Sequence, residues 1–349
     1  MYLKTTAVVE DIKLSARSTG GNHKRSVSFP FGDVEIEFFD VRDNYSDGCR
    51  GSFKLTYIKE VLVSEQLKKL VDAYCSGKKP KSNSNSRAIS VCDLTNHDGP
   101  ELPLSMYPKQ LEQFLKDEVY QASNRLKTFI STLRWRFNID SKLKPWSKIN
   151  SLCSGDGKSN WRIISPLETH IRYAGDNVIP IDLATAEDTL ELSVAEDGEP
   201  TGHELLREAK EVSNISVRAS LIMAIASVEV RLKDLISSRS PSSEWLIKSI
   251  PSPPVVKIVA RYLPELFDEY KSEIEAFKKT KHFKLIDKQI EKRNETSHLG
   301  AEGPKDMLIY ELLESVKQFL WFCDYLSGFH WAREFFDQET ESCFSISKE

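Results

Sequence analysis

ELLREAKEVSNISVRASLIMAIASVEVRLKDLIS, residues 204–237, is the stretch that decides the architecture of the C-terminal half of this chain. Its apolar residues recur at intervals of three and four, which is the spacing of one face of an α-helix. That face consists of Leu221, Ala224, Ile225, Val228, Leu232 and Leu235. We therefore predict one long helix over 204–237 that buries a wide apolar face against other helices.

Helical patterns continue toward the C-terminus of the chain. Four further helices are predicted, over 243–250, 255–278, 282–296 and 305–336. A proline cluster at 251–254 separates the first two, because proline lacks the backbone donor and clashes with the preceding turn. Residues 201–349 are thus expected to form an all-α, antiparallel bundle.

The first 60 residues have the alternation of half-buried strands instead. Apolar and polar residues alternate over 34–38, and the pattern returns over 53–57 after a turn-rich stretch, Asp43–Gly51. The period then changes to that of a helix over 64–76, with Ser64 as the expected N-cap. A longer amphipathic helix is predicted from Pro108 to about Asn138.

Residues 145–200 have a mixed pattern. Short strands are predicted at Ala88–Leu94 and Trp161–Ile164, and the acidic, turn-rich stretch Glu187–Pro200 is interpreted as an interdomain connection. The predicted fold class is α+β: a mixed α/β domain over 1–200, interpreted as a sensor or regulatory module, followed by the helical domain over 201–349.

Composition indicates a soluble, cytoplasmic globular protein. Forty per cent of the 349 residues are hydrophobic and 29% are charged, with a formal net charge of −4. The N-terminal residues do not resemble a secretory signal, and Arg218 and Glu229 interrupt the apolar stretch Leu221–Ala226 that most nearly resembles a membrane span. The near-neutral charge excludes a generic polyanion binder, so a charged partner has to be recognised by a local patch.

The cysteines give no sign of a metal site or a disulfide framework. They are Cys49, Cys75, Cys92, Cys153, Cys323 and Cys343. No pair has CxxC spacing, and no Cys/His group has zinc-finger spacing. We expect reduced thiols, no metal and no cofactor.

Some segments only partly match functional motifs. Gly155–Ser159 (GDGKS) ends like a phosphate-binding P-loop, but Leu152 stands where that motif needs glycine, so a turn is expected. The segments 20–25 and 77–87 are expected to be polar loops. In Arg134-Trp135-Arg136-Phe137 the two aromatic residues cannot both face one core on an amphipathic helix, so one is expected to be exposed or at an interface, where it could stack on a base.

The most informative segment is KRNETSHLG, residues 292–300, which contains Arg293-Asn294 followed by His298. Five residues on a helix correspond to about 500°, so Arg293 and His298 point about 140° apart. They can meet on one target only if the helix ends between them or if two chains share the site. Glycines and a proline over 300–304 suggest a helix end close by.

Here the chain resembles the HEPN family, whose signature is an Arg followed by a polar residue and then by a His four to six residues after the Arg. The resemblance covers about 204–336, and it implies a compact helical bundle. Many members are metal-independent endoribonucleases of prokaryotic immunity and toxin–antitoxin systems. It also implies a homodimer that brings two Arg/His sets into one cleft, RNA as substrate, and an antitoxin or other regulatory partner.

The resemblance assigns catalysis to Arg293, Asn294 and His298. Metal-free cleavage of RNA needs a base for the 2′-OH, a cation for the charged phosphorane and an acid for the leaving 5′-oxygen. His298 suits acid or base work, because an unperturbed imidazole has a pKa of about 6.5, and Arg293 offers a fixed cationic fork for phosphate oxygens. Asn294 can orient either group. Glu229 is expected either to hold the Arg or His in place or to pair with Arg231 or Lys233 on a solvated face.

Basic residues cluster just before the motif. They are Lys278, Lys279, Lys281, Lys284, Lys288 and Lys292, together with Arg293, against only Asp287 and Glu291, a local net charge of +5. We expect these lysines to contact RNA phosphates, with a merely solvated helix face as the alternative. The alternatives to a ribonuclease are a non-catalytic RNA- or nucleotide-binding bundle and a partner-binding scaffold.

Overall fold

The protein divides into two compact units in a computed structural model that describes residues 1–14, 24–42, 49–76, 104, 107–138, 146–155, 157, 161–167, 178–179, 183–196, 198–299 and 306–344. Unit 1 is Met1–Leu133 with Lys144–Gly198, and unit 2 is Arg134–Leu143 with Glu199–Glu349. The division at 198/199 lies two residues from the expected one. Residues 134–143, however, group with unit 2, although the sequence analysis placed them in the first domain.

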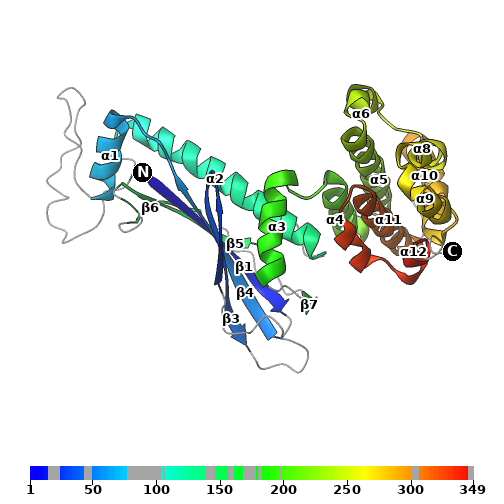
Figure 1. Ribbon diagram of the computed structural model, residues 1–349, viewed down its shortest axis with the longest axis horizontal. Helices are drawn as coiled ribbons and strands as arrows, with labels where there is room; N and C mark the ends of the chain where they lie inside the picture. Colours follow the sequence, from blue (N-terminus) through cyan, green and yellow to red (C-terminus); the bar gives the residue numbers. More distant parts are fainter. Residues whose placement is uncertain are drawn as a thin grey trace. The chain divides into compact units, whose positions relative to one another are not determined.

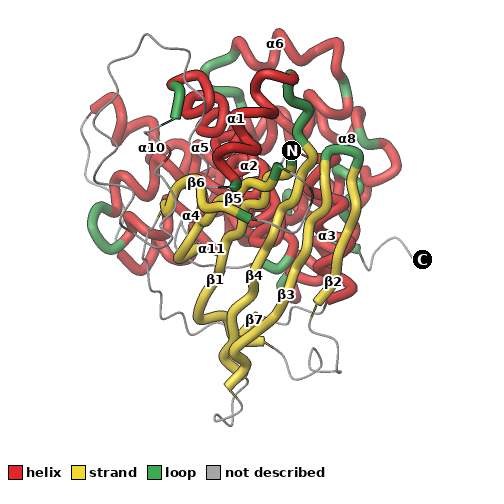
Figure 2. Tube along the Cα trace, turned by 90° about the vertical axis from the view of Figure 1, so that its left-hand side faces the viewer, coloured by secondary structure: helices red, strands yellow, loops and turns green. Residues whose placement is uncertain are grey.

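Unit 1 contains a seven-stranded sheet. Its strands are β1 (Tyr2–Leu14), β2 (Lys24–Phe29), β3 (Gly32–Arg42), β4 (Cys49–Glu60), β5 (Trp146–Ser154), β6 (Arg162–Leu167) and β7 (Val178–Ile179). The order is β2-β3-β4-β1-β5-β6, with every neighbouring pair antiparallel, and the short β7 pairs with β1 in parallel. Figure 2 shows β2, β3, β4 and β1 side by side. The predicted strands at 34–38, 53–57 and 161–164 are confirmed, whereas 88–94 lies outside the described residues.

Alternation places the apolar residues of these strands on one face. Val34 pairs with Tyr57 and Ile36 with Leu55, and all four side chains are buried. Helix α2 (Lys109–Arg136) covers this face (Figure 1), and its Phe129 ring packs against Tyr57, with ring centroids 6.3 Å apart. The sheet and α2 therefore share the core of unit 1.

The helices of unit 1 test three predictions. Helix α1 (Glu65–Cys75) begins after Ser64, whose hydroxyl accepts a hydrogen bond from the Leu67 amide, so the predicted N-cap is confirmed. The long helix from 108 to about 138 is confirmed as α2. The stretch 187–200 is not a loop connection, because most of it belongs to helix α3 (Leu183–Glu196). Leu190 and Ser193 of α3 are buried, so packing outweighs the acidic composition.

Unit 2 is helical throughout its described residues. Its α-helices are α4 (Thr201–Ser213), α5 (Val217–Arg239), α6 (Glu244–Ser249), α7 (Val255–Lys257), α8 (Leu263–Leu266), α9 (Lys271–Phe277), α10 (Lys281–Leu299), α11 (Asp306–Leu326) and α12 (Gln338–Ser342). They enclose one core, in which Leu232, Phe277 and Phe319 are fully buried. None of the helices described in either unit is long and apolar enough to cross a membrane.

Three of the helices predicted for unit 2 are shorter in the structure than the sequence suggested. The helix expected over 204–237 is two helices, because Asn214 ends α4 and the Ser216 hydroxyl caps a new one by accepting from the Ala219 amide. The stretch 255–278 breaks into short helical segments, one of them a π turn at Ile258–Tyr262. The last helix ends at Leu326 rather than 336, since Gly328 has a φ of +98°, and a 3₁₀ turn follows.

Candidate functional site

The Arg-Asn-His motif lies wholly within α10. The helix continues to Leu299, so the helix end expected between Arg293 and His298 is not there. Positions 293 and 298 consequently lie about 140° apart around the helix axis. The backbone of His298 belongs to α10, but its side chain falls outside the described part of the chain. Within a single chain, the helix directs the two motif positions to different sides.

Arg293 points toward the core side of α10 and contacts a carboxylate of α5. Its Nη2 donates to the Oε1 of Glu229 and to the Oγ of Ser252, the latter at 3.1 Å. Ser252 in turn donates to the same Glu229 oxygen at 2.7 Å. Only 14% of the Arg293 side chain and 11% of the Glu229 side chain are exposed. The three residues form a compact polar cluster, which we call the Arg293 cluster.

The alternative partners of Glu229 are engaged elsewhere. Arg231 donates to Asp324, and the Lys233 ammonium donates to the carbonyl of Ile250. The interpretation of Glu229 as a member of a solvated ion pair with either residue is therefore wrong. Glu229 holds Arg293 instead, at the position that the resemblance implied for a supporting carboxylate.

A buried nitrogen of the Arg293 guanidinium, Nε, has no hydrogen-bond partner among the described residues. A buried unsatisfied donor costs free energy, and such groups concentrate where a ligand or water completes the site. Asn294, next in sequence, is exposed, and positions 294 and 298 lie four residues apart, on one side of α10.

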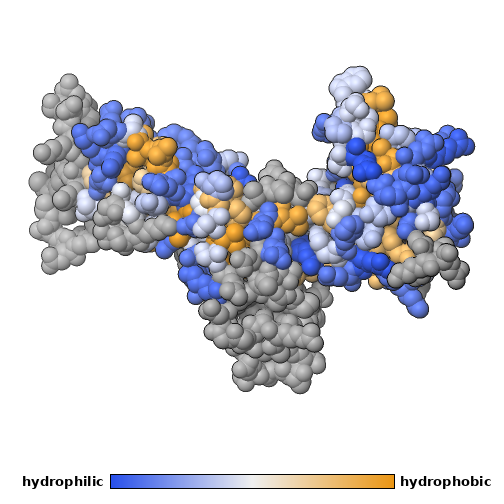
Figure 3. Space-filling model, viewed as in Figure 1, coloured by the Kyte–Doolittle hydropathy of each residue, from blue (hydrophilic) through white to orange (hydrophobic). Residues whose placement is uncertain are grey.

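The predicted lysines do not surround the Arg293 guanidinium. Lys281, Lys284, Lys288 and Lys292 follow one another at three- and four-residue spacing, and this stripe lies on the side of α10 away from Arg293. The visible surface over α8, α9 and α10 is mostly hydrophilic (Figure 3). The lysine stripe and the Arg293 guanidinium therefore do not form one continuous basic surface within one chain.

Carboxylates neutralise part of the basic run. Lys278 pairs with Glu275 at 2.7 Å, Lys281 with Glu339 at 3.2 Å and Lys292 with Glu295 at 3.2 Å. Lys279, Lys284 and Lys288 are exposed. Exposed ion pairs of this kind contribute less than about 1 kcal/mol each.

The Arg134–Phe137 segment has a different role from the one predicted. Trp135 is fully buried and Phe137 is 9% exposed, so neither side chain is available for stacking on a base. The prediction failed because α2 ends at Arg136, which lets Phe137 leave the helical direction. The indole N–H of Trp135 donates to Asp324 at 2.8 Å.

Asp324 is the centre of a buried polar network that sequence reasoning missed. Besides Trp135, it binds the Nε2 of His203 at 2.7 Å and the Nε of Arg231 at 2.8 Å, and it is completely buried. Burial alone would raise the pKa of Asp324, but the charges of His203 and Arg231 and the hydrogen bonds lower it below its ordinary value. The only signal in the sequence was a carboxylate inside the apolar run of α11. Within unit 2, this network joins Trp135 to α4, α5 and α11.

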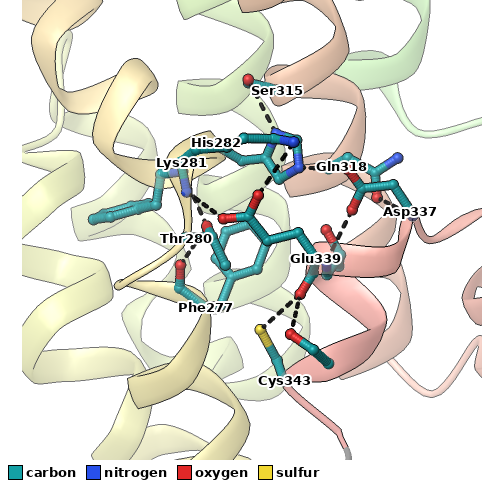
Figure 4. A network of polar contacts seen from close by, with 12 residues as sticks. Phe277, Thr280, Lys281, His282, Ser315, Gln318, Asp337, Glu339 and Cys343 are labelled. Carbon is teal, nitrogen blue, oxygen red and sulfur yellow. Dashed lines mark hydrogen bonds and ion pairs between the residues drawn. The ribbon is translucent and has the colours of Figure 1, made fainter.

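A third network contains the residue types of a serine hydrolase. The Oγ of Ser315 meets the Nδ1 of His282 at 3.1 Å, and the Nε2 of His282 meets Asp337 at 2.7 Å (Figure 4). Ser315 lies in the middle of α11 and is only 4% exposed, so a substrate carbonyl has no access to its hydroxyl. Asp337 also caps α12 by accepting from the Thr340 amide at 2.8 Å. The network attaches the C-terminal segment to α10 and α11.

Acid should weaken this attachment. Partial burial alone would raise the pKa of Asp337, but the Thr340 amide and His282 lower it below its ordinary value. The stabilisation is therefore complete above the unfolded-state pKa of about 3.9 and is lost as the pH falls through the folded-state value. We expect Asp337→Asn to destabilise the protein by about 1–2 kcal/mol at pH 7, because His282 loses its carboxylate partner while the asparagine still caps α12, and to approach wild type as the pH falls below about 3.9. Thermal melts of wild type and Asp337→Asn across pH test this, and Asp268→Asn, which changes an exposed aspartate, is the control. A difference in stability between wild type and Asp337→Asn that persists in acid would contradict the prediction.

The P-loop-like segment and the two predicted polar loops show no functional arrangement in the part of the chain that the structure describes. Gly155 follows β5 directly, but the next element that the structure describes is strand β6 rather than the helix that a P-loop requires. Of the loop predicted over 20–25, Lys24 and Arg25 instead begin strand β2, where they pair with β3, and residues 20–23 and 77–87 lie outside the described residues. Among the described residues, no group of three or more His, Cys, Asp or Glu side chains is placed to hold a metal ion.

Comparisons of the chain with protein-family models, with curated proteins and with solved structures found no match. The functional assignment therefore depends on the motif, its place in α10 and the contacts around Arg293.

Proposed function

We propose that this protein is a metal-independent endoribonuclease of the HEPN type that acts in phage defence or as a toxin. The observation that carries the proposal is the contact between Arg293 and Glu229. A carboxylate that fixes the guanidinium preorganises a cation for the developing charge of a phosphorane, which is the largest demand of this reaction. Unit 1 is then the sensor, specificity or regulatory module.

The proposed mechanism divides the work among the motif residues. Arg293 stabilises the phosphorane, His298 transfers a proton to or from the reacting oxygens, and exposed Asn294 orients the phosphate or the imidazole. Glu229 acts as a positioning residue, and the stripe of lysines along α10 guides the RNA backbone. RNA supplies its own nucleophile, the 2′-OH.

The geometry of α10 supports a homodimer through unit 2. Since positions 293 and 298 face different sides of one continuous helix, one chain does not present both to the same phosphate. Two chains related by a twofold axis would place the Arg of one beside the His of the other. An active protein that remains monomeric at assay concentration, as measured by sedimentation velocity, would contradict this part of the proposal.

Cleavage in EDTA tests the activity. Full-length protein is expected to cut RNA and leave 2′,3′-cyclic phosphate ends. Removal of a charge-stabilising group or of an acid–base group costs about 10²–10⁴ in rate, so Arg293→Ala and His298→Ala should each lose about 10³-fold. Glu229→Gln should lose about tenfold, because it only positions Arg293. The control is Arg261→Ala, which removes an exposed arginine of the same unit and should leave the rate unchanged.

Other outcomes point to the other functions. Binding of RNA without cleavage would favour a non-catalytic RNA-binding bundle, and equal behaviour of wild type and both motif variants in every RNA assay would favour a scaffold. A toxin should also limit growth when it is expressed, whereas His298→Ala should be tolerated. Equal tolerance of both proteins would contradict the toxin assignment.

A further inference from the structure

Two cysteines that are 78 residues apart in the sequence meet in unit 1. Cys75 is the last residue of α1, and Cys153 lies in β5, where it pairs with Leu3 of β1 and Arg162 of β6. Their Sγ atoms are 3.6 Å apart. Both are free thiols in the structure, and nothing in the sequence indicated that they lie together. We propose that Cys75 and Cys153 are a site of oxidation by hydroperoxides, at which Cys75 reacts first and Cys153 then closes a reversible disulfide.

The distance between the sulfurs suits this step. A disulfide has an S–S length of about 2.05 Å, so the two sulfurs must approach by about 1.5 Å. Cys75 is only half-buried at the end of α1, so rotation about its Cα–Cβ bond can contribute to this movement. Cys153 stays in the sheet, with strands on both sides.

The surroundings assign different roles to the two thiols. Cys75 is half-buried, so a small peroxide can reach it, whereas Cys153 is fully buried. The hydrogen bond from Cys153 lowers the pKa of Cys75; burial opposes this, and the Gly155 amide and the charge of Arg162 lower the pKa further. For Cys153, the same hydrogen bond and its burial raise the pKa. Cys75 is thus the thiol that reaches the reactive thiolate form more readily.

A buried cation is fixed beside Cys75. The guanidinium of Arg162 lies 4.1 Å from the ring centroid of Tyr74, and its Nη1 donates to the carbonyl of Tyr74, the residue before Cys75. Arg162 is only 2% exposed, so solvent screens its charge little. A fixed positive charge of this kind favours a thiolate over a thiol.

The chemistry balances with one hydroperoxide as oxidant. The Cys75 thiolate attacks the peroxide, an S–O bond forms while the O–O bond breaks, and the leaving oxygen departs as water or an alcohol after it takes up a proton. The Cys153 sulfur then attacks the sulfur of the Cys75 sulfenic acid, an S–S bond forms, and hydroxide leaves with the Cys153 proton as water. Two thiols are oxidised by two electrons in total, and the peroxide is reduced by two. A dithiol reductant reverses the bond.

Mass spectrometry on the wild-type full-length protein tests the proposal without any substitution. Reduced protein is treated with one equivalent of hydrogen peroxide, free thiols are alkylated, and the non-reduced digest is analysed. We expect a peptide linked through Cys75 and Cys153 that disappears on reduction. We also expect loss of the Cys75 thiol at least about tenfold faster than loss of the Cys343 thiol, whose pKa burial raises to about 11. Absence of the linked peptide, or equal rates at Cys75 and Cys343, would overturn the proposal.

Variants assign the order of the two steps. In Cys153→Ser the reaction should stop at a sulfenic acid on Cys75, which dimedone traps, whereas in Cys75→Ser the thiol at 153 should remain alkylatable after unfolding. The matched control Cys343→Ser removes a buried cysteine of unit 2 and should form the linked peptide at the wild-type rate. Trapping at 153 in place of 75 would overturn the assignment of Cys75 as the first thiol. None of these measurements depends on RNA cleavage.

Discussion

Asp324→Ala is expected to lower the free energy of unfolding of unit 2 by about 3–5 kcal/mol, because removal of one partner leaves the other charge buried and unpaired. Arg231 is 4% exposed and donates its Nε to Asp324. Without the carboxylate, the bond from its Nη2 to Ser327 remains, and that hydroxyl carries no charge. His203 and Trp135 would lose their acceptor in the same place.

Chemical denaturation of the full chain measures this effect. Asp324→Asn should fall between wild type and Asp324→Ala, because an amide keeps one acceptor oxygen for Trp135 and His203 but no charge for Arg231. The control Asp268→Ala removes an exposed aspartate of the same unit, and its effect should stay within about 0.5 kcal/mol. If Asp324→Ala were as stable as this control, the network would not hold the helices together.

Gly32→Ala is expected to destabilise unit 1 by about 3 kcal/mol, through a backbone clash together with backbone strain. Gly32 begins β3 after the two-residue turn Pro30-Phe31 and has a φ of +143°. An added Cβ would lie 2.4 Å from the carbonyl oxygen of Ile58 and 3.0 Å from the Cα of Lys59. Both are backbone atoms of the neighbouring strand β4, so they cannot move without distorting the sheet.

A second glycine separates the two causes. Gly157 also has a positive φ, +127°, but an added Cβ there would meet nothing within 4 Å. Gly157→Ala should therefore cost only the conformational part, about 1 kcal/mol. Comparison of the denaturation midpoints of the two variants measures the contribution of the clash. Equal effects would show that the approach of β4 to Gly32 has no energetic consequence.

Local patterns were sufficient where a segment's neighbours in sequence decide its conformation. The alternation over 34–38 and 53–57, the Ser64 cap of α1 and the extent of α2 were all predicted. The break at 214–216 was missed, because the apolar spacing continues across it and one serine hydroxyl ends the pattern. Helix α3 was missed because its acidic residues suggested a loop. The burial of one face of this segment determines that it is helical instead.

The candidate site divides in the same way. The Arg-Asn-His spacing and the presence of a helix around it are properties of the sequence, as is the choice of Glu229 as a possible support. Glu229 could pair with any of three cations of the same charge, Arg231, Lys233 or Arg293. Only the packing of α5 against α10 selects Arg293 as its partner.

By itself, the sequence determined the α+β class, most strands and helices and the motif on α10, because periodicity and capping act over a few neighbouring residues. Only the tertiary structure decided that Arg293 contacts Glu229 while the lysine stripe lies on the other side of α10. It also decided that Trp135 and Arg231 both bind Asp324 and that Cys75 lies beside Cys153. The two residues of each contact are between 64 and 189 positions apart in the sequence. Contacts over such separations depend on which surfaces exclude water together, and no local pattern contains that information.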